Sequence, residues 1–101
     1  EFIEAFIHPF YLINTSRGKI AVRNDLEKAL RSGKLLGAAL DVLDDENLPA
    51  YSEKEWIALR EFMQSGNVLI TPHIAGWTRE ARQKIFMLVL KKFHEVLKKA
   101  L

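Results

Sequence analysis

Three short apolar runs decide the fold of this chain: FYLIN at 10–14, GAALDVL at 37–43 and NVLIT at 67–71. Turn-forming residues bound each run, so each is predicted to be a short buried strand. Helical patterns separate the runs, and a longer one follows the last. This alternation predicts an α/β fold with a parallel sheet and right-handed crossovers.

The helix between the first two runs has signals at both ends. Asn24, with Glu27 three residues later, predicts a capping box. Gly33 is placed to end that helix in a left-handed conformation. Ahead of the first run, residues 2–7 are expected to be the end of another helix, which Pro9 stops.

The two later helices are marked in the same way. Ser52 with Glu55 predicts a second capping box, and Gly66 ends that helix. Its inward side is expected to carry Trp56, Leu59 and Met63. The last helix is predicted to start after Thr78 and to run to about Lys99. Its apolar positions follow a 3.6-residue period: Ile85, Leu88, Val89, Phe93, Val96, Leu97 and Ala100.

The composition restricts the function classes. The 101 residues suffice for one small domain, and a hydrophobic fraction of 49% argues against disorder. The absence of cysteine excludes disulfides, thiol catalysis and cysteine-ligated zinc. The net charge is only +2. A cluster of lysines near the end is interpreted as a solvated helix face, and a nucleic-acid or membrane surface is the weaker alternative: Lys91, Lys92, Lys98 and Lys99.

Nothing in the chain resembles a membrane span or a targeting signal. The apolar stretch at 85–90 is far shorter than the ~20 residues that a span needs. The first ten residues lack the charged leader and cleavage site of a signal peptide, so a cytoplasmic location is expected. They also lack an initiator methionine, so we expect the chain to belong to a longer protein.

A chemically useful residue follows each predicted strand: Arg17, Glu46 and His73. In a parallel sheet, ligands bind beyond the carboxyl ends of the strands, where these residues are expected to meet. Arginine can clamp a carboxylate, and histidine exchanges protons near neutral pH. A carboxylate hydrogen-bonded to the imidazole favours its protonated form and fixes its tautomer. Such a site suits reduction of a keto acid or oxidation of a hydroxy acid.

Each residue also has a simpler interpretation. Alone, Arg17 would be a loop salt bridge, Glu46 part of a solvated acidic loop, and His73 a turn residue. His8 and His94 have no supporting context and are interpreted as structural or solvent-facing. A serine nucleophile at Ser16 is disfavoured, because GxSxG is absent. A metal site is the main chemical alternative, although no metal is expected; its ligands would be Asp41, Asp44, Asp45, Glu46 and His73.

The three strand-end segments resemble the motifs of one family. INTSRG at 13–18, GAALDV at 37–42 with a glutamate five residues after Asp41, and TPHIAGWTREA at 71–81 resemble the arginine, glutamate and histidine motifs of the NAD-dependent D-2-hydroxyacid dehydrogenases. That family includes D-3-phosphoglycerate, D-lactate, glycerate and formate dehydrogenases. The resemblance covers essentially residues 1–100. It implies the second half of a Rossmann-like parallel sheet of about three strands, with flanking helices and a long C-terminal helix.

The resemblance also implies a role for each site residue. Arg17 would bind the substrate carboxylate. His73 would be the general acid in keto-acid reduction, paired with Glu46. The cofactor would be NAD, with Asp41 holding the nicotinamide carboxamide. The implied cofactor-binding residues are Thr15, Ser16, Arg17, Asp41, His73, Ala75 and Gly76.

The chain departs from the family pattern in two respects. Asn47 stands where a proline commonly follows the catalytic glutamate. The glycine-rich dinucleotide turn, GxGxxG, is absent from the 101 residues, so residues 1–101 are interpreted as the C-terminal part of a nucleotide-binding domain without a substrate domain. We therefore expect the isolated chain to be inactive. We also expect it to self-associate through the strand at 10–14 or through its last helix.

For the parent protein, the resemblance implies a small 2-keto or 2-hydroxy acid substrate and a homodimer. It implies no nucleic-acid or membrane partner. A second possibility stays open: some relatives of these enzymes are co-repressors that sense NAD(H) through the same fold.

Overall fold

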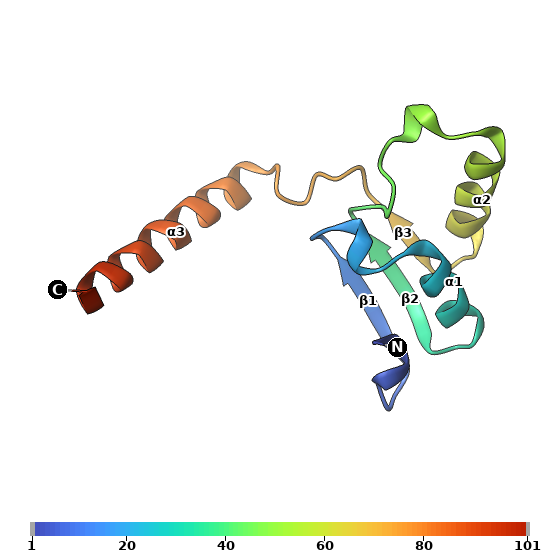
Figure 1. Cartoon of the computed structure of the whole chain (residues 1–101), viewed down its shortest axis with the longest axis horizontal. Coiled ribbons are helices and arrows are strands. Elements are labelled where there is room, and N and C mark those ends of the chain that lie inside the picture. Colours follow the sequence, from blue (N-terminus) through green and yellow to red (C-terminus); the bar gives the residue numbers. More distant parts are fainter. Residues whose placement is uncertain (1, 101) are drawn as a thin grey trace.

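The computed structural model describes residues 2–100 and has one three-stranded parallel sheet of order β1-β2-β3 (Figure 1). The strands are β1 (Phe10–Asn14), β2 (Leu35–Leu40) and β3 (Val68–Ile70). The helices are α1 (Arg23–Arg31), α2 (Glu53–Gln64) and α3 (Arg79–Ala100). Three short 3₁₀ turns complete the described part of the chain: η1 (Ile3–Ala5), η2 (Gly18–Ile20) and η3 (Leu48–Ala50). The predicted α/β alternation is confirmed, whereas residues 2–7 contain only the turn η1 rather than the end of a longer helix.

The strands are in register at their carboxyl ends. Asn14 pairs with Leu40, and Leu40 pairs with Ile70. β2 starts two residues before the predicted run and ends before Asp41, whose side chain turns toward the segment after β3. The loops that follow the three strands therefore leave the sheet at one edge.

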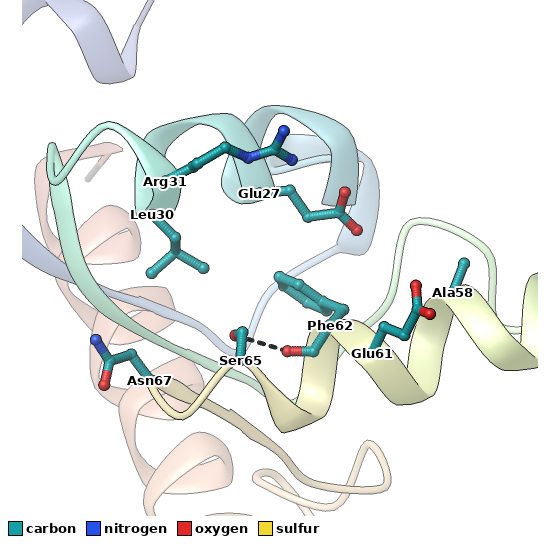
Figure 2. Close-up of a pocket in the computed structure, with 8 residues that line it drawn as sticks. All are labelled: Glu27, Leu30, Arg31, Ala58, Glu61, Phe62, Ser65 and Asn67. Carbon is teal, nitrogen blue, oxygen red and sulfur yellow. Dashed lines mark hydrogen bonds between the residues drawn. The ribbon is translucent and has the colours of Figure 1, made fainter.

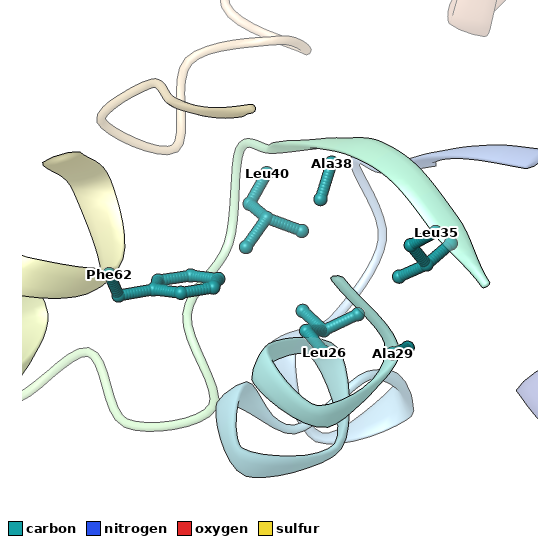
Figure 3. Close-up of a cluster of buried hydrophobic side chains, with 6 residues drawn as sticks. All are labelled: Leu26, Ala29, Leu35, Ala38, Leu40 and Phe62. Atoms are coloured by element: carbon teal, nitrogen blue, oxygen red, sulfur yellow. The ribbon is translucent and has the colours of Figure 1, made fainter. Parts of the chain in front are cut away.

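Helices α1 and α2 cover the same face of the sheet (Figure 1). Figure 3 shows the core between them and the strands: Leu26, Ala29, Leu35, Ala38, Leu40 and Phe62. Leu26 and Leu35 are almost fully buried. Burial of a leucine side chain stabilises a fold by about 1.5–3 kcal/mol. This core joins two layers, the sheet and the pair of helices α1 and α2.

The start of α1 differs from its prediction. The residue before the helix is Val22, and its side chain makes no capping hydrogen bond. Asn24 lies inside the first turn instead. The carboxylate of Asp44, from the loop after β2, accepts a hydrogen bond from Arg23 N at 3.2 Å. A cap supplied from 21 residues away cannot be read from the local sequence, which is why the predicted capping box is wrong. The stop at Gly33 is confirmed by its φ of +77°.

The second helix follows its local signals more closely. The Ser52–Glu55 capping box is present, and Gly66 follows the helix with a φ of +89°. Its inward face, however, presents Leu59 and Phe62 to the core. Trp56 and Met63, predicted to share that face, are 43% and 47% exposed. The rotation of the helix about its own axis is set by the fit of Phe62 into the core, which the apolar period alone does not determine.

Helix α3 extends away from the sheet (Figure 1). It starts after Thr78, whose Oγ1 accepts a hydrogen bond from Ala81 N at 3.0 Å, so this predicted cap is confirmed. No residue of α3 is buried. The radius of gyration is 17.7 Å, against about 13 Å for a compact chain of this length. In residues 2–100, no helix is both long and apolar enough to cross a membrane.

Candidate active site

The loop after β1 is organised by a buried amide. Asn14, only 6% exposed, donates from Nδ2 to the carbonyl oxygen of Arg17 at 3.0 Å. Its Oδ1 accepts from Ser16 N at 3.1 Å. The guanidinium of Arg17 is exposed and donates to the carbonyl oxygen of Ser16 at 2.7 Å. The amide therefore holds the backbone of Arg17, and the charged group stays exposed beside the loop, where an anion can approach.

The arginine loop touches the glutamate loop at Gly18. An added Cβ at Gly18 would overlap the backbone of Leu43 and Asp44. Beside this contact is a hollow of about 370 Å³ that both loops line, with Arg17 on one side and Glu46 on the other. Glycine at this position therefore allows the two loops to approach closely enough to share one hollow.

Glu46 lies in a loop stabilised by its neighbours. Asp45 Oδ1 accepts from Asn47 N at 2.9 Å, and the hydroxyl of Tyr51 donates to the carbonyl oxygen of Asp45 at 2.6 Å. Burial raises the pKa of Tyr51, and the negative charges of Asp45 and Asp44 add to the rise. The phenol therefore stays protonated and keeps its role as donor. These two hydrogen bonds restrain the loop around Glu46, in which Asn47 stands at the position where proline is common in the family.

His73 pairs with Glu46 across the strand edge. The imidazole Nδ1 lies 2.9 Å from Oε1 and 3.2 Å from Oε2 of Glu46. Both side chains are about half exposed, at 48% and 46%. An ionised carboxylate only accepts hydrogen bonds, so Nδ1 carries a proton and Nε2 is the atom that can exchange one with a substrate. The predicted pair is thus brought together from loops that are 27 residues apart.

Asp41 bonds to the segment that carries His73. Asp41 is buried, with only 5% of its surface exposed. Its carboxylate accepts hydrogen bonds from Thr71 Oγ1 at 2.6 Å, from Ile74 N at 3.0 Å and from Ala75 N at 2.9 Å. The Thr71 hydroxyl, followed by the backbone N–H of Ala75, holds the pKa of Asp41 below its ordinary value of 3.8. Between these donors, His73 has a φ of +56°. Few residues other than glycine adopt this left-handed conformation.

A second hollow, of about 350 Å³, lies on the open face of the sheet at the same edge. Three of the predicted cofactor-binding residues line it: Thr15, Asp41 and Ala75. Apart from Thr71, the other walls are apolar and include Ile13 and Leu69. A carboxylate offers about four acceptor positions, so Asp41 retains one for a ligand donor. Apolar walls beside a free carboxylate acceptor are the groups that a flat ring carrying an amide, such as the nicotinamide of NAD, would need.

The remaining predicted residues are less closely assembled. Ser16 contributes its carbonyl oxygen to Arg17 and its amide to Asn14, and Gly76 has open space around its Cβ position. His8 and His94 are exposed. Within residues 2–100, no group of three or more histidine and acidic side chains could hold a metal ion.

Sequence reasoning missed three residues that shape the site: Asn14, Tyr51 and Thr71. Asn14 and Thr71 are polar side chains at the very end of apolar strands, which is a readable signal. Tyr51 had no such signal, because its partner is the backbone of Asp45 in a loop.

The structure has another hollow, of about 410 Å³, between α1 and α2 (Figure 2). Its lining includes Glu27, Arg31, Glu61 and Asn67. Asn67 precedes β3, so this hollow lies toward the amino ends of the strands. None of the predicted site residues contributes to it, and it is a groove between helices rather than part of the strand-end site.

A sequence profile of the D-isomer specific 2-hydroxyacid dehydrogenases, describing their NAD-binding domain, matches residues 1–75. The chain belongs to this family. The expected family is thereby confirmed, with a match that covers the first two motifs and the third as far as Ala75, and NAD is the cofactor of this domain type.

Individual relatives agree with this assignment. The chain is 47% identical over 83 residues to a D-3-phosphoglycerate dehydrogenase of Haemophilus influenzae, covering 81% of this chain and 19% of that protein. It is 43% identical over 88 residues to a glyoxylate reductase of Thermofilum pendens, covering 87% of this chain and 24% of that protein. The chain thus spans about a fifth to a quarter of the length of such relatives.

Solved structures support the fold. A D-lactate dehydrogenase of Aquifex aeolicus, complexed with NAD and lactic acid, has a TM-score of 0.63 and 31% identity, covering 96% of this chain and 31% of that one. The NAD complex of a D-isomer specific 2-hydroxyacid dehydrogenase from Lactobacillus delbrueckii has a TM-score of 0.58 and 30% identity, covering 87% and 28%. The three parallel strands and their helices are therefore part of a Rossmann-like NAD-binding fold.

Proposed function

We propose that the protein containing this chain is an NAD-dependent oxidoreductase that interconverts a D-2-hydroxy acid and its 2-keto acid. Residues 1–101 would be the C-terminal part of its NAD-binding domain. The observation that carries the proposal is the Glu46–His73 pair at the edge of the sheet, with Arg17 lining a hollow shared with Glu46. We further infer a homodimer, as the family resemblance implies, and a cytoplasmic location for the whole protein.

The roles follow from what each group can do. Arg17 binds the carboxylate of the substrate through its planar guanidinium and orients the neighbouring keto group. His73 delivers a proton from Nε2 to the keto oxygen, and the hydride that the carbon must receive would come from the reduced form of NAD when it is bound. In the reverse direction His73 removes the hydroxyl proton. Glu46 stabilises the charged imidazole and keeps the Nδ1 side occupied.

Two substitutions in the full-length protein test these roles. His73→Gln is expected to lower kcat by roughly 10²–10⁴-fold, because general acid–base catalysis contributes that much. NADH binding, measured by fluorescence, should be unchanged. Arg17→Ala is expected mainly to raise KM for the keto acid and also to lower kcat, in an assay of NADH oxidation with a panel of 2-keto acids.

His94→Gln is the matched control, since His94 is exposed on α3 and far along the chain from the strand ends. Wild-type kinetics for His73→Gln or for Arg17→Ala would contradict the role given to that residue. If the wild-type protein reduced none of the 2-keto acids while binding NADH, the NAD(H)-sensing alternative would replace the enzyme.

The isolated 101-residue chain is expected to be inactive. Hydride transfer requires the nicotinamide to be held against the substrate carbon, and the chain contains no GxGxxG turn to bind the pyrophosphate. Detectable NADH oxidation by the isolated chain with pyruvate or hydroxypyruvate would show this expectation to be wrong.

A further inference from the structure

We propose that Asp41 and Thr71 are positioning residues that hold the backbone of His73 in its left-handed conformation and thereby direct the imidazole toward Glu46. The proposal concerns geometry and rests on the proposed function only for the importance of His73. It gives Asp41 a role in addition to the cofactor contact that the family resemblance implies.

The first argument is the backbone of His73. Its φ of +56° is the only positive value among non-glycine residues in the described part of the chain, residues 2–100. Residues with a Cβ adopt this region seldom, histidine more often than most, and they keep it where the surroundings determine it. Something in the fold must therefore hold residue 73 in place.

The second argument is that one carboxylate binds both sides of His73. Before it, the Thr71 hydroxyl donates to Asp41 Oδ1 at 2.6 Å. After it, the amides of Ile74 and Ala75 donate to Oδ1 and Oδ2 at 3.0 and 2.9 Å. The segment 71–75 thus wraps around a single side chain, and His73 is at the turn.

The wrapped segment closes on itself as well. His73 N donates to the carbonyl oxygen of Thr71 at 2.9 Å, which makes a three-residue turn centred on Pro72. Proline fixes its own φ, so the turn has little freedom on that side. The freedom that remains is at residue 73, where Asp41 restrains the next two amides.

The carboxylate itself is anchored to the sheet. Asp41 directly follows β2, and its backbone N–H donates to the carbonyl oxygen of Asn14 at 2.9 Å. The residue is buried, and its neighbours in β2 are part of the core. Asp41 thus fixes the segment around His73 relative to the edge of the sheet. The imidazole Nδ1 in that position lies 2.9 Å from Oε1 of Glu46.

The consequence is a specific state of the imidazole. With the turn held, neutral His73 carries its proton on Nδ1, because Glu46 accepts there. With the turn loosened, residue 73 is free to return to a right-handed or extended backbone. The imidazole then loses Glu46 and adopts the Nε2–H tautomer that free histidine favours. A merely structural role for Thr71 would lower stability without changing this tautomer.

Thr71 allows the sharpest test, since Thr71→Val removes the hydroxyl and keeps the shape, whereas Thr71→Ser keeps the hydroxyl. The measurement is the ¹⁵N spectrum of the histidine rings at alkaline pH in the full-length protein without cofactor. We expect His73 to be in the Nδ1–H form in the wild type and in Thr71→Ser, and largely in the Nε2–H form in Thr71→Val. His94, exposed on α3, is the internal reference. An unchanged His73 tautomer in a folded Thr71→Val protein would overturn the proposal.

Kinetics provide a second readout. Thr71→Val is expected to lower kcat at least tenfold, and Thr71→Ser to recover most of the loss. Equal kcat for wild type and Thr71→Val would count against the proposal.

If Thr71→Val does not fold, the tautomer of His73 is compared between wild type and Asp41→Glu instead. That variant keeps the charge and moves the acceptor oxygens by one methylene. If the wild type lacks dehydrogenase activity but the tautomer responds as expected, the proposed function fails while the positioning role stands.

Discussion

Gly18 is the residue at which the arginine and glutamate loops come closest. A methyl group there would overlap the carbonyl of Leu43, and both groups belong to the backbone, so neither side can give way cheaply. Glycine at this position is required by space rather than by its torsion angle. The shared hollow between Arg17 and Glu46 depends on that approach.

We predict that Gly18→Ala lowers the free energy of unfolding by about 3 kcal/mol or more, since overpacking against backbone forces the loops apart. Gly76→Ala is the matched control, because nothing lies within 4 Å of a Cβ built there. It should change stability by less than about 0.5 kcal/mol. Urea unfolding of both variants measures the difference, and equal midpoints would show that the loops can separate freely.

Asp41 makes the histidine segment sensitive to acid. Its pKa is lowered in the folded state, first by the Thr71 hydroxyl and then by the Ala75 amide. Its ionised form therefore stabilises the fold fully above the ordinary value of 3.8, and this contribution is lost as the pH falls through the lower folded-state pKa.

We predict that the backbone amide shifts of Ile74 and Ala75 move together in an acid titration, with a midpoint below pH 3.8, as their acceptor is protonated. Asp41→Asn should abolish this shared transition and leave the titrations of other carboxylates in place. A midpoint above 3.8 in the wild type would mean that the hydrogen bonds to Asp41 do not favour its charged form.

At the scale of elements, the loop 41–47 is fixed by what surrounds it. Asp44 caps α1 by accepting from Arg23 N, and the Tyr51 hydroxyl ties the carbonyl of Asp45 from the start of the next helical region. The ring of Tyr51 packs near Trp56 of α2, with centroids 5.5 Å apart. The loop that carries Glu46 is therefore held by contacts to the start of α1 on one side and, through Tyr51, to α2 on the other.

We predict that Tyr51→Phe destabilises the protein by about 1 kcal/mol, the usual net contribution of one hydrogen bond. Because the lost bond is next to Glu46, the proposed activity of the full-length protein should also fall through a lower kcat. Tyr11→Phe is the control for thermal unfolding of the 101-residue chain, in which Tyr11 is 72% exposed. Thermal unfolding and steady-state kinetics measure the two effects. Identical behaviour of both variants would show that the Tyr51 hydroxyl does not stabilise the loop.

At the scale of the whole molecule, large apolar surfaces are exposed. Helices cover one face of the sheet only, and Tyr11, Ile13 and Leu69 on the other face are 63–76% exposed. The apolar side chains of α3 are also exposed, including Phe86 and Phe93. Parallel sheets are ordinarily covered on both faces, and exposed strand edges pair with other chains.

We predict that the 101-residue chain self-associates at concentrations of roughly 10–100 μM, the range in which weak hydrophobic contacts become populated. Sedimentation velocity over a dilution series measures the association. Ile13→Lys places a charge on the open face without touching the core and should shift the chain toward monomer. A wild-type chain that stays monomeric throughout would contradict the prediction.

The amino-acid sequence by itself determined the order of strands and helices, the three motifs and the stops at Gly33 and Gly66. These features depend on local physics: apolar runs, capping side chains and residues that tolerate a left-handed backbone. The contact between Glu46 and His73 could also be predicted, because the carboxyl ends of parallel strands meet at one edge.

Only the tertiary structure decided how that edge is held. The cap of α1 by Asp44, the rotation that turns Phe62 inward, and the wrapping of segment 71–75 around Asp41 all join residues far apart in the chain. A hydrogen bond between distant loops depends on where the sheet places both partners. The sequence supplies the donors and acceptors, and the packing of the fold determines which of them come within hydrogen-bond distance.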